Sequence, residues 1–188
     1  YPYCWKECEV LDNGPLRFTA KLVYNPLVIK GDSNVVETRV ISLDKGSQLN
    51  KTVISYTDLK EVTPIVAGIV IHKENPTGYS FDSNAGYIAY ADSTQNPRNN
   101  NGVIYVGAVF PASLNAAKAQ LFPEAERKEH GGALGHVLGI SDYEPGTEYV
   151  YYWGSGWSKY GFAADTEWTK YLENFAQQVR NPLTVTVK

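Results

Sequence analysis

The sequence has no methionine, only two cysteines and only three histidines among its 188 residues. It also lacks any apolar run near the roughly 20 residues that a membrane-spanning helix requires, so we expect no membrane as a partner. Its lysines and arginines do not gather into a patch and the net charge is −3, which argues against nucleic acid as a partner. Because no initiator methionine is present, we expect the chain to be a processed or truncated part of a longer precursor.

Several catalytic fingerprints are absent as well. The sequence contains no nucleophile elbow, phosphate-binding loop, zinc-binding helix motif or dinucleotide fingerprint, which argues against serine hydrolases, kinases and dehydrogenases. Cys4 and Cys8 lie four positions apart, without two further ligands at zinc-binding spacing nearby. Either a small local disulfide in an exported protein or a pair of free thiols fits them, and we expect neither a metal nor another cofactor.

What the sequence does contain is a pattern typical of β-strands. Tyrosine, of which there are 14, and β-branched residues occur in runs that Gly, Pro, Asn and Asp separate. One helix is expected at about 165–180, where Trp168 and Leu172 recur at helical spacing, and a helical turn near 114–121. Strands are expected at 16–24, 35–43, 48–57, 65–73, 86–92, 103–110, 133–140, 148–153 and 183–187. Because strands and helices do not alternate, the sequence predicts a single antiparallel β-sandwich domain over residues 1–188 with one C-terminal helix.

One stretch, residues 133–162, combines a histidine with an aromatic loop that contains glycine. The runs 133–140 and 148–153 are expected to form a hairpin that places His136 beside this loop. Tyr152, Trp153 and Trp157 are then candidates for stacking against a sugar ring, and Lys159 for binding a carboxylate. An ordinary cluster of core aromatic residues is the alternative interpretation.

Candidate catalytic residues lie on other strands as well. His72 and His136 are expected in mid-strand among apolar neighbours, where an imidazole can transfer protons or can simply be a hydrogen-bonded core residue. Glu37 and Arg39 are two apart and therefore share a face of one strand. They are a candidate general base and a candidate carboxylate ligand, or else a structural ion pair. Tyr90 is a further candidate for substrate binding.

Four segments carry a resemblance to a known family: GPLR (14–17), ETRVISLDKGSQLN (37–50), GYIAYAD (86–92) and YYWGSGWSK (151–159). Together they resemble an uncharacterised bacterial family found in polysaccharide-utilisation gene clusters, itself similar to the galactose-mutarotase-like β-supersandwich. The resemblance covers nearly the whole chain and matches the C-terminal half of such proteins. It implies a partner in the N-terminal half of the same precursor, a periplasmic or extracellular location, and sugars as ligands.

The resulting hypothesis is a carbohydrate-active protein that acts on or binds oligosaccharides, above all acidic plant or algal-type sugars. The expected chemistry is that of an epimerase, a lyase or a glycoside hydrolase working in a groove of the sandwich. A noncatalytic carbohydrate-binding module and a structural domain of an exported protein are the alternatives. Convergence of the histidines with Glu37, Arg39 and the aromatic loop in one cleft would favour an enzyme, and dispersal would favour the alternatives.

Overall fold

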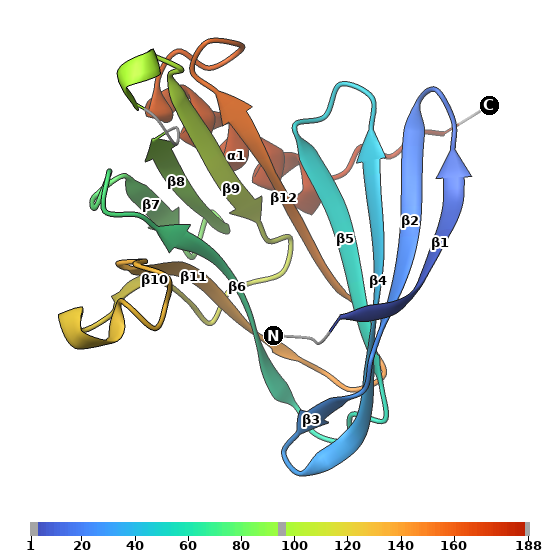
Figure 1. Cartoon of the computed structure of the whole chain (residues 1–188). Helices are drawn as coiled ribbons and strands as arrows, with labels where there is room; N and C mark the ends of the chain where they lie inside the picture. The colour runs from blue at the N-terminus through green and yellow to red at the C-terminus, as the bar shows by residue number, and fades with distance from the viewer. Residues whose placement is uncertain (1–3, 94–96, 187–188) are drawn as a thin grey trace. The chain divides into compact units, whose positions relative to one another are not determined.

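The computed structural model describes residues 4–93 and 97–186, and these residues are mainly β. Among them the chain forms twelve β-strands, one α-helix and two short 3-10 helices. The chain divides into two compact units (Figure 1). Unit 1 comprises Tyr1–Ile65 and Asp142–Gly154, and unit 2 comprises Val66–Ser141 and Ser155–Lys188.

Unit 1 is an antiparallel sheet. Its strands follow the order β1-β2-β4-β5-β12, and the short strand β3 pairs with β4. The β4–β5 link turns at Gly46, whose φ of 85° suits glycine, and Ser47 N–H donates to the Asp44 carbonyl. The strands are β1 (Trp5–Asn13), β2 (Arg17–Tyr24), β3 (Leu27–Ile29), β4 (Asp32–Asp44), β5 (Leu49–Thr57) and the first six residues of β12 (Tyr149–Trp157).

The register of this sheet decides which side chains share a face. Residues directly opposite each other point the same way, and neighbours along a strand point to opposite faces. Glu37 is opposite Tyr56 and Arg39 is opposite Ile54, while Ile54 is also opposite Tyr149. One face therefore carries alternate residues of four strands: Phe18, Ala20, Leu22 and Tyr24 of β2; Glu37, Arg39, Ile41 and Leu43 of β4; Thr52, Ile54 and Tyr56 of β5; Tyr149, Tyr151 and Trp153 of β12.

Unit 2 contains two sheets and the helix. The strand order of its first sheet is β12-β9-β8-β7 and that of its second sheet is β10-β11-β6. Tyr90 of β8 bonds to the backbone of His72, which follows β6, so the two sheets pack face to face. The elements are β6 (Thr63–Ile71), β7 (Tyr79–Asp82), β8 (Tyr87–Ser93), η1 (Pro97–Asn99), β9 (Val103–Val109), β10 (Ala116–Leu121), η2 (Glu124–Glu126), β11 (Gly135–Tyr143) and α1 (Asp165–Arg180).

Helix α1 covers the other face of the first sheet (Figure 1). It buries Trp168, Leu172 and Ala176, one residue per turn. Gly107 of β9 makes the close approach possible, because a Cβ there would lie within 3.0 Å of Leu172 and Trp168. Strands β8 and β9 are therefore covered on both faces, as their apolar runs indicate.

The predicted fold class and the helix at 165–180 are confirmed, but three local predictions are wrong. Runs 133–140 and 148–153 are not a hairpin, since β11 pairs with β10 and β6 whereas β12 pairs with β5 and β9. Segment 114–121 forms strand β10 rather than a helical turn. Residues 183–186 form no strand, and residue 187 lies outside the described residues.

Cys4 and Cys8 are free and exposed, so the disulfide alternative does not apply. Within the described part of the chain, we find no helix with the length and apolar character needed to cross a membrane.

Candidate functional site

The strongest polar cluster of unit 1 is built around Glu37. Its side chain is only 2% exposed. One carboxylate oxygen accepts a hydrogen bond from Arg39 Nε, and the other accepts one from the Tyr56 hydroxyl at 2.7 Å. Burial, together with the charge and hydrogen bond of Glu37, raises the pKa of Tyr56 well above its ordinary value. Both partners of Glu37 are thus hydrogen-bond donors, so each of its two buried carboxylate oxygens has a partner.

Aromatic rings surround the guanidinium of Arg39. Its Cζ lies 5.0 Å from the centre of the Tyr24 ring, a distance suited to a cation–π contact. Burial lowers the pKa of Arg39, but the charge and hydrogen bond of Glu37 outweigh this effect and the pKa ends above its ordinary value. A quarter of the Arg39 side chain (24%) remains exposed. The cluster therefore presents a fixed, permanently charged planar group to solvent.

Trp153 lies further along the same face. Its indole N–H donates to Thr52 Oγ1 at 2.7 Å, which fixes the ring, and the residue is 40% exposed. Tyr151 is opposite Thr52 and is close enough to Arg39 to interact with its charge. Tyr151 therefore lies between Arg39 and Trp153. We call the set Tyr24, Glu37, Arg39, Tyr56, Tyr151 and Trp153 the tyrosine face.

Tyr152, which we expected to bind substrate, is on the opposite face of this sheet. It is opposite Lys51, and both point away from the tyrosine face because their neighbours Tyr151 and Thr52 point toward it. Arg17 and Asp44 also lie on the opposite face, as an exposed ion pair. This separates Tyr152 from Glu37 and Arg39.

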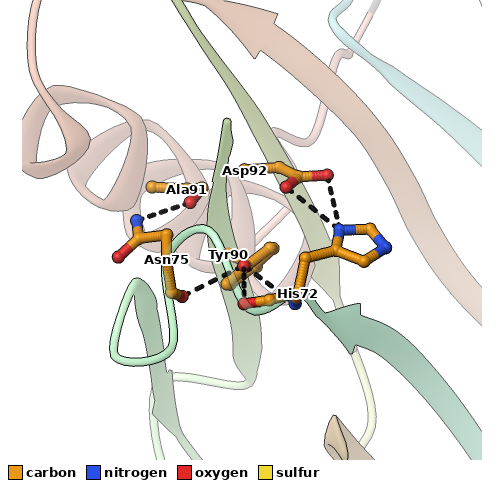
Figure 2. A network of polar contacts seen from close by, with 5 residues as sticks. All are labelled: His72, Asn75, Tyr90, Ala91 and Asp92. Carbon is orange, nitrogen blue, oxygen red and sulfur yellow. Dashed lines mark hydrogen bonds and ion pairs between the residues drawn. The ribbon is translucent and has the colours of Figure 1, made fainter. Parts of the chain in front are cut away.

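A second cluster, in unit 2, contains His72 (Figure 2). His72 Nδ1 lies 3.0 and 3.1 Å from the two carboxylate oxygens of Asp92. With a proton on Nδ1 to bond Asp92, the other ring nitrogen, Nε2, keeps its lone pair. The His72 side chain is 46% exposed, so this arrangement suits a proton acceptor.

Buried groups hold the backbone beside this pair. The Tyr90 hydroxyl accepts the His72 N–H at 3.0 Å and lies 3.0 Å from the Asn75 carbonyl. Asn75 Nδ2 donates to the carbonyl of Ala91, the residue before Asp92, at 2.7 Å. Tyr90 is 1% exposed, and its hydroxyl positions the backbone of His72; its expected contact with a ligand stays a prediction.

His136 lies in a different part of unit 2. Its ring meets Phe122 edge-on at 5.2 Å, and His130 stacks on that Phe122 at 3.8 Å. Burial first, and the charge of His130 second, lower the pKa of His136. These contacts suit a neutral, packed imidazole, which is the structural alternative weighed for this residue.

Trp157 and Lys159 belong to the end of β12 and the loop after it. Trp157 is 42% exposed, and its indole N–H donates to the Asn101 carbonyl at 2.7 Å. Lys159 packs beside Gly102, where a Cβ added to the glycine would lie 3.2 Å from Lys159 Cγ. Trp157 is thus a second fixed and exposed ring, in unit 2.

The candidates therefore form several separate sets: Glu37 with Arg39, His72 with Tyr90, His136, and Trp157 with Lys159. Sequence reasoning missed Tyr24, Tyr56 and Tyr151 as members of the first set. Strand alternation offered one signal, because Tyr151 and Trp153 are two apart and share a face. Among the described residues, no group of three or more His, Cys, Asp or Glu side chains could hold a metal ion.

Comparison with known proteins gives one family. No curated protein and no solved structure matches the chain. A family model described as "Domain of unknown function (DUF4861)" matches residues 1–185. The chain therefore belongs to the DUF4861 family.

Proposed function

We propose that this protein is carbohydrate-active and binds acidic oligosaccharides on the tyrosine face of unit 1. The observation that carries the proposal is the fixed, partly exposed guanidinium of Arg39, bonded to Glu37 and flanked by the Tyr24 ring. A planar guanidinium can bind a carboxylate through two parallel hydrogen bonds. A uronate, the acidic unit of such sugars, supplies that carboxylate.

Stacking supports the same ligand class. Sugar rings pack their CH faces on aromatic rings while their hydroxyls form hydrogen bonds. Trp153 offers a ring whose orientation is fixed by its hydrogen bond to Thr52. Tyr151 lies between Trp153 and Arg39 on the same face of the sheet. Glu37 is too deeply buried to meet a ligand, so its role in this proposal is to orient Arg39.

Calorimetric titration tests the proposal. Oligogalacturonate and a neutral galactose oligosaccharide of equal length are titrated into the wild type, Arg39→Lys and Arg17→Gln. Arg39→Lys keeps the charge next to Glu37 but loses the planar fork, so affinity for oligogalacturonate falls by about tenfold or more. Arg17→Gln removes a charge from the opposite face and leaves affinity unchanged. Equal binding of both ligands by all three proteins contradicts the proposal.

A second candidate function, proton transfer in unit 2, is favoured by the His72–Asp92 geometry. The step that fits a single base is removal of the proton beside a uronate carboxylate. Return of a solvent proton to the opposite face then gives epimerisation, whereas loss of the neighbouring alkoxide, which takes a proton from solvent, gives elimination. Glycoside hydrolysis instead needs two carboxylates on either side of the bond, and the dyad offers one. The protein is incubated with oligogalacturonate in D₂O. Epimerisation is detected as deuterium at the exchanged carbon, and elimination is detected as a new conjugated double bond. Asp92→Asn lowers this activity and His72→Gln abolishes it; a wild type without either product excludes the enzyme and leaves the binding module.

The remaining expectations join the same proposal. The sequence resemblance supports three further expectations. They are kinship with galactose-mutarotase-like proteins, a partner in the N-terminal half of one precursor, and a periplasmic or extracellular location. A protein of a polysaccharide-utilisation cluster meets polymers outside the cytoplasm. Cell fractionation of the source organism tests the location directly, and recovery in the cytoplasm contradicts it.

A further inference from the structure

A pocket in unit 2 shares Tyr90 and Ala91 with the His72 cluster, but neither His72 nor Asp92 lines it. Its volume is about 330 Å³, which is at the lower end of the range for small-molecule sites. It lies between the first turns of α1 and strands β7 and β8. Its lining includes Ser80, Ala89, Ala91, Tyr105, Thr166 and Thr169.

Small side chains create this space. Tyr105 is opposite Ala91, and Ala89 is opposite both Gly107 and Ser80, so all of them point to the face that α1 covers. The helix rests on this face through Trp168 and Leu172 at Gly107. Beyond that contact the sheet lines the space with the small side chains of Ala89, Ala91 and Ser80 and with Tyr105. The helix turns a polar stripe toward the space, including Thr166, Thr169, Lys170 and Glu173.

Tyr105 supplies the observation that points to a ligand. The residue is 4% exposed, yet no hydrogen bond joins its hydroxyl to any residue that the structure describes. A buried Tyr hydroxyl usually finds a partner. Burial first, and the charges of Asp165 and Glu167 second, raise the pKa of Tyr105, so the hydroxyl keeps its proton, and the residue lines the pocket together with the first turn of α1. The Tyr105 hydroxyl is therefore a donor without an acceptor among the described residues.

The charges of the pocket restrict the ligand. Lys170 faces two carboxylates in the lining, Asp165 and Glu173, so an anionic sugar meets net negative charge. Thr169 donates its hydroxyl proton to the Asp165 carbonyl at 3.0 Å, which leaves the oxygen as an acceptor. The lining therefore offers both donors, such as the Tyr105 hydroxyl, and acceptors, such as Thr169 Oγ1, and a ligand whose own groups are hydroxyls can use both.

We propose that this pocket binds a neutral, polyhydroxylated ligand of about one sugar ring, with the Tyr105 hydroxyl donating to one of its oxygens. The site differs in ligand class from the tyrosine face, which the Arg39 cation suits to acidic units. It does not depend on Arg39 or on the His72–Asp92 pair.

An NMR titration of the whole chain tests this inference. The probes are D-galactose, D-glucose and L-rhamnose, with D-galacturonate as the charged comparison. Wild-type protein is compared with Tyr105→Phe, which removes only the hydroxyl, and with Ala91→Val, which adds volume inside the pocket. Tyr160→Phe is the matched control, because Tyr160 is 77% exposed and lies outside the lining.

Saturable shifts of the Trp168 and Thr169 signals with at least one neutral sugar are expected. Tyr105→Phe weakens this binding by about threefold to tenfold, the usual effect of one hydrogen bond, Ala91→Val weakens it further, and Tyr160→Phe has no effect. The inference is overturned if no neutral probe shifts these signals up to its solubility limit, or if Ala91→Val binds like the wild type. Failure here leaves the Arg39 titration with oligogalacturonate unaffected, so the two proposals fail separately.

Discussion

Removing the Glu37 carboxylate is the most informative perturbation of unit 1. Glu37→Ala leaves Arg39 without its ion-pair partner and the Tyr56 hydroxyl without its acceptor. Breaking a buried pair on one side costs about 3 to 5 kcal/mol, because the remaining charge stays desolvated. Since a quarter of the Arg39 side chain reaches solvent, we expect the lower end, about 3 kcal/mol.

Urea denaturation measures this loss. With a slope of about 2 kcal/mol per molar urea for a chain of this size, a loss of 3 kcal/mol lowers the midpoint by about 1.5 M. Glu37→Gln loses the charge and keeps one acceptor oxygen, so it can accept from only one of the two donors, and its midpoint falls by less than that of Glu37→Ala. Intrinsic fluorescence and circular dichroism recorded together show whether unfolding has one transition or two.

Asp44→Ala is the matched control, because it removes a carboxylate that also pairs with an arginine, at an exposed position on the opposite face. Its midpoint stays at the wild-type value, since exposed ion pairs contribute little. A Glu37→Ala midpoint equal to that of Asp44→Ala would refute the reasoning. It would mean that solvent reaches the Glu37 cluster freely.

Three further predictions follow from packing and charge. Trp153→Ala weakens oligosaccharide binding several-fold in a calorimetric titration, since stacking on a ring contributes about 1 kcal/mol, while Tyr152→Ala on the opposite face does not. The pKa of His136 is lower in the folded protein than its ordinary value of 6.5, so the unfolded chain binds the proton more tightly. The free energy of unfolding therefore falls as the pH drops below 6.5. His136→Gln flattens this part of a urea-midpoint-against-pH plot, and an unchanged slope counts against the assignment. Gly107→Ala forces Leu172 and helix α1 away from β9 and lowers the thermal midpoint, at a cost of about 1 to 3 kcal/mol.

Local patterns were sufficient for most elements of the fold. Runs of strand-forming residues between turn signals predicted β2, β4, β5, β8 and β9 to within a few residues, and the spacing of Trp168 and Leu172 predicted α1. Strand β10 was missed because its sequence, AAKAQL, has the composition of a helix. Its pairing with β11 along six residue pairs overrides that preference.

Strand pairing could not be predicted from the sequence in the same way. The turn between residues 143 and 149 suggested a hairpin, yet β11 and β12 pair with other strands. Partner choice depends on contacts between residues far apart in the chain, which local periodicity does not record. The same limit explains the site: Glu37 and Arg39 share a face by their spacing, whereas Tyr56, 19 positions away, joins them only through the register of β4 and β5.

Tyr152 shows what composition alone leaves open within a run of aromatic residues. Tyr151, Tyr152 and Trp153 are consecutive, and a loop would have allowed all three to meet one ligand. Because the segment is a strand, its side chains alternate, and only Tyr151 and Trp153 share the face of Arg39. Strand alternation applied to the predicted strand 148–153 would have put Tyr151, rather than Tyr152, beside Trp153.

The most direct test of acidic-sugar binding at the tyrosine face is an NMR titration that follows the Arg39 Nε–H and Trp153 indole N–H signals. Oligogalacturonate is the ligand. Arg39 and Trp153 are expected to shift together with one dissociation constant, and a neutral galactose oligosaccharide is expected to leave the Arg39 signal in place. Shifts confined to Trp157, or an Arg39 signal that is unchanged at saturation with oligogalacturonate, would contradict the account.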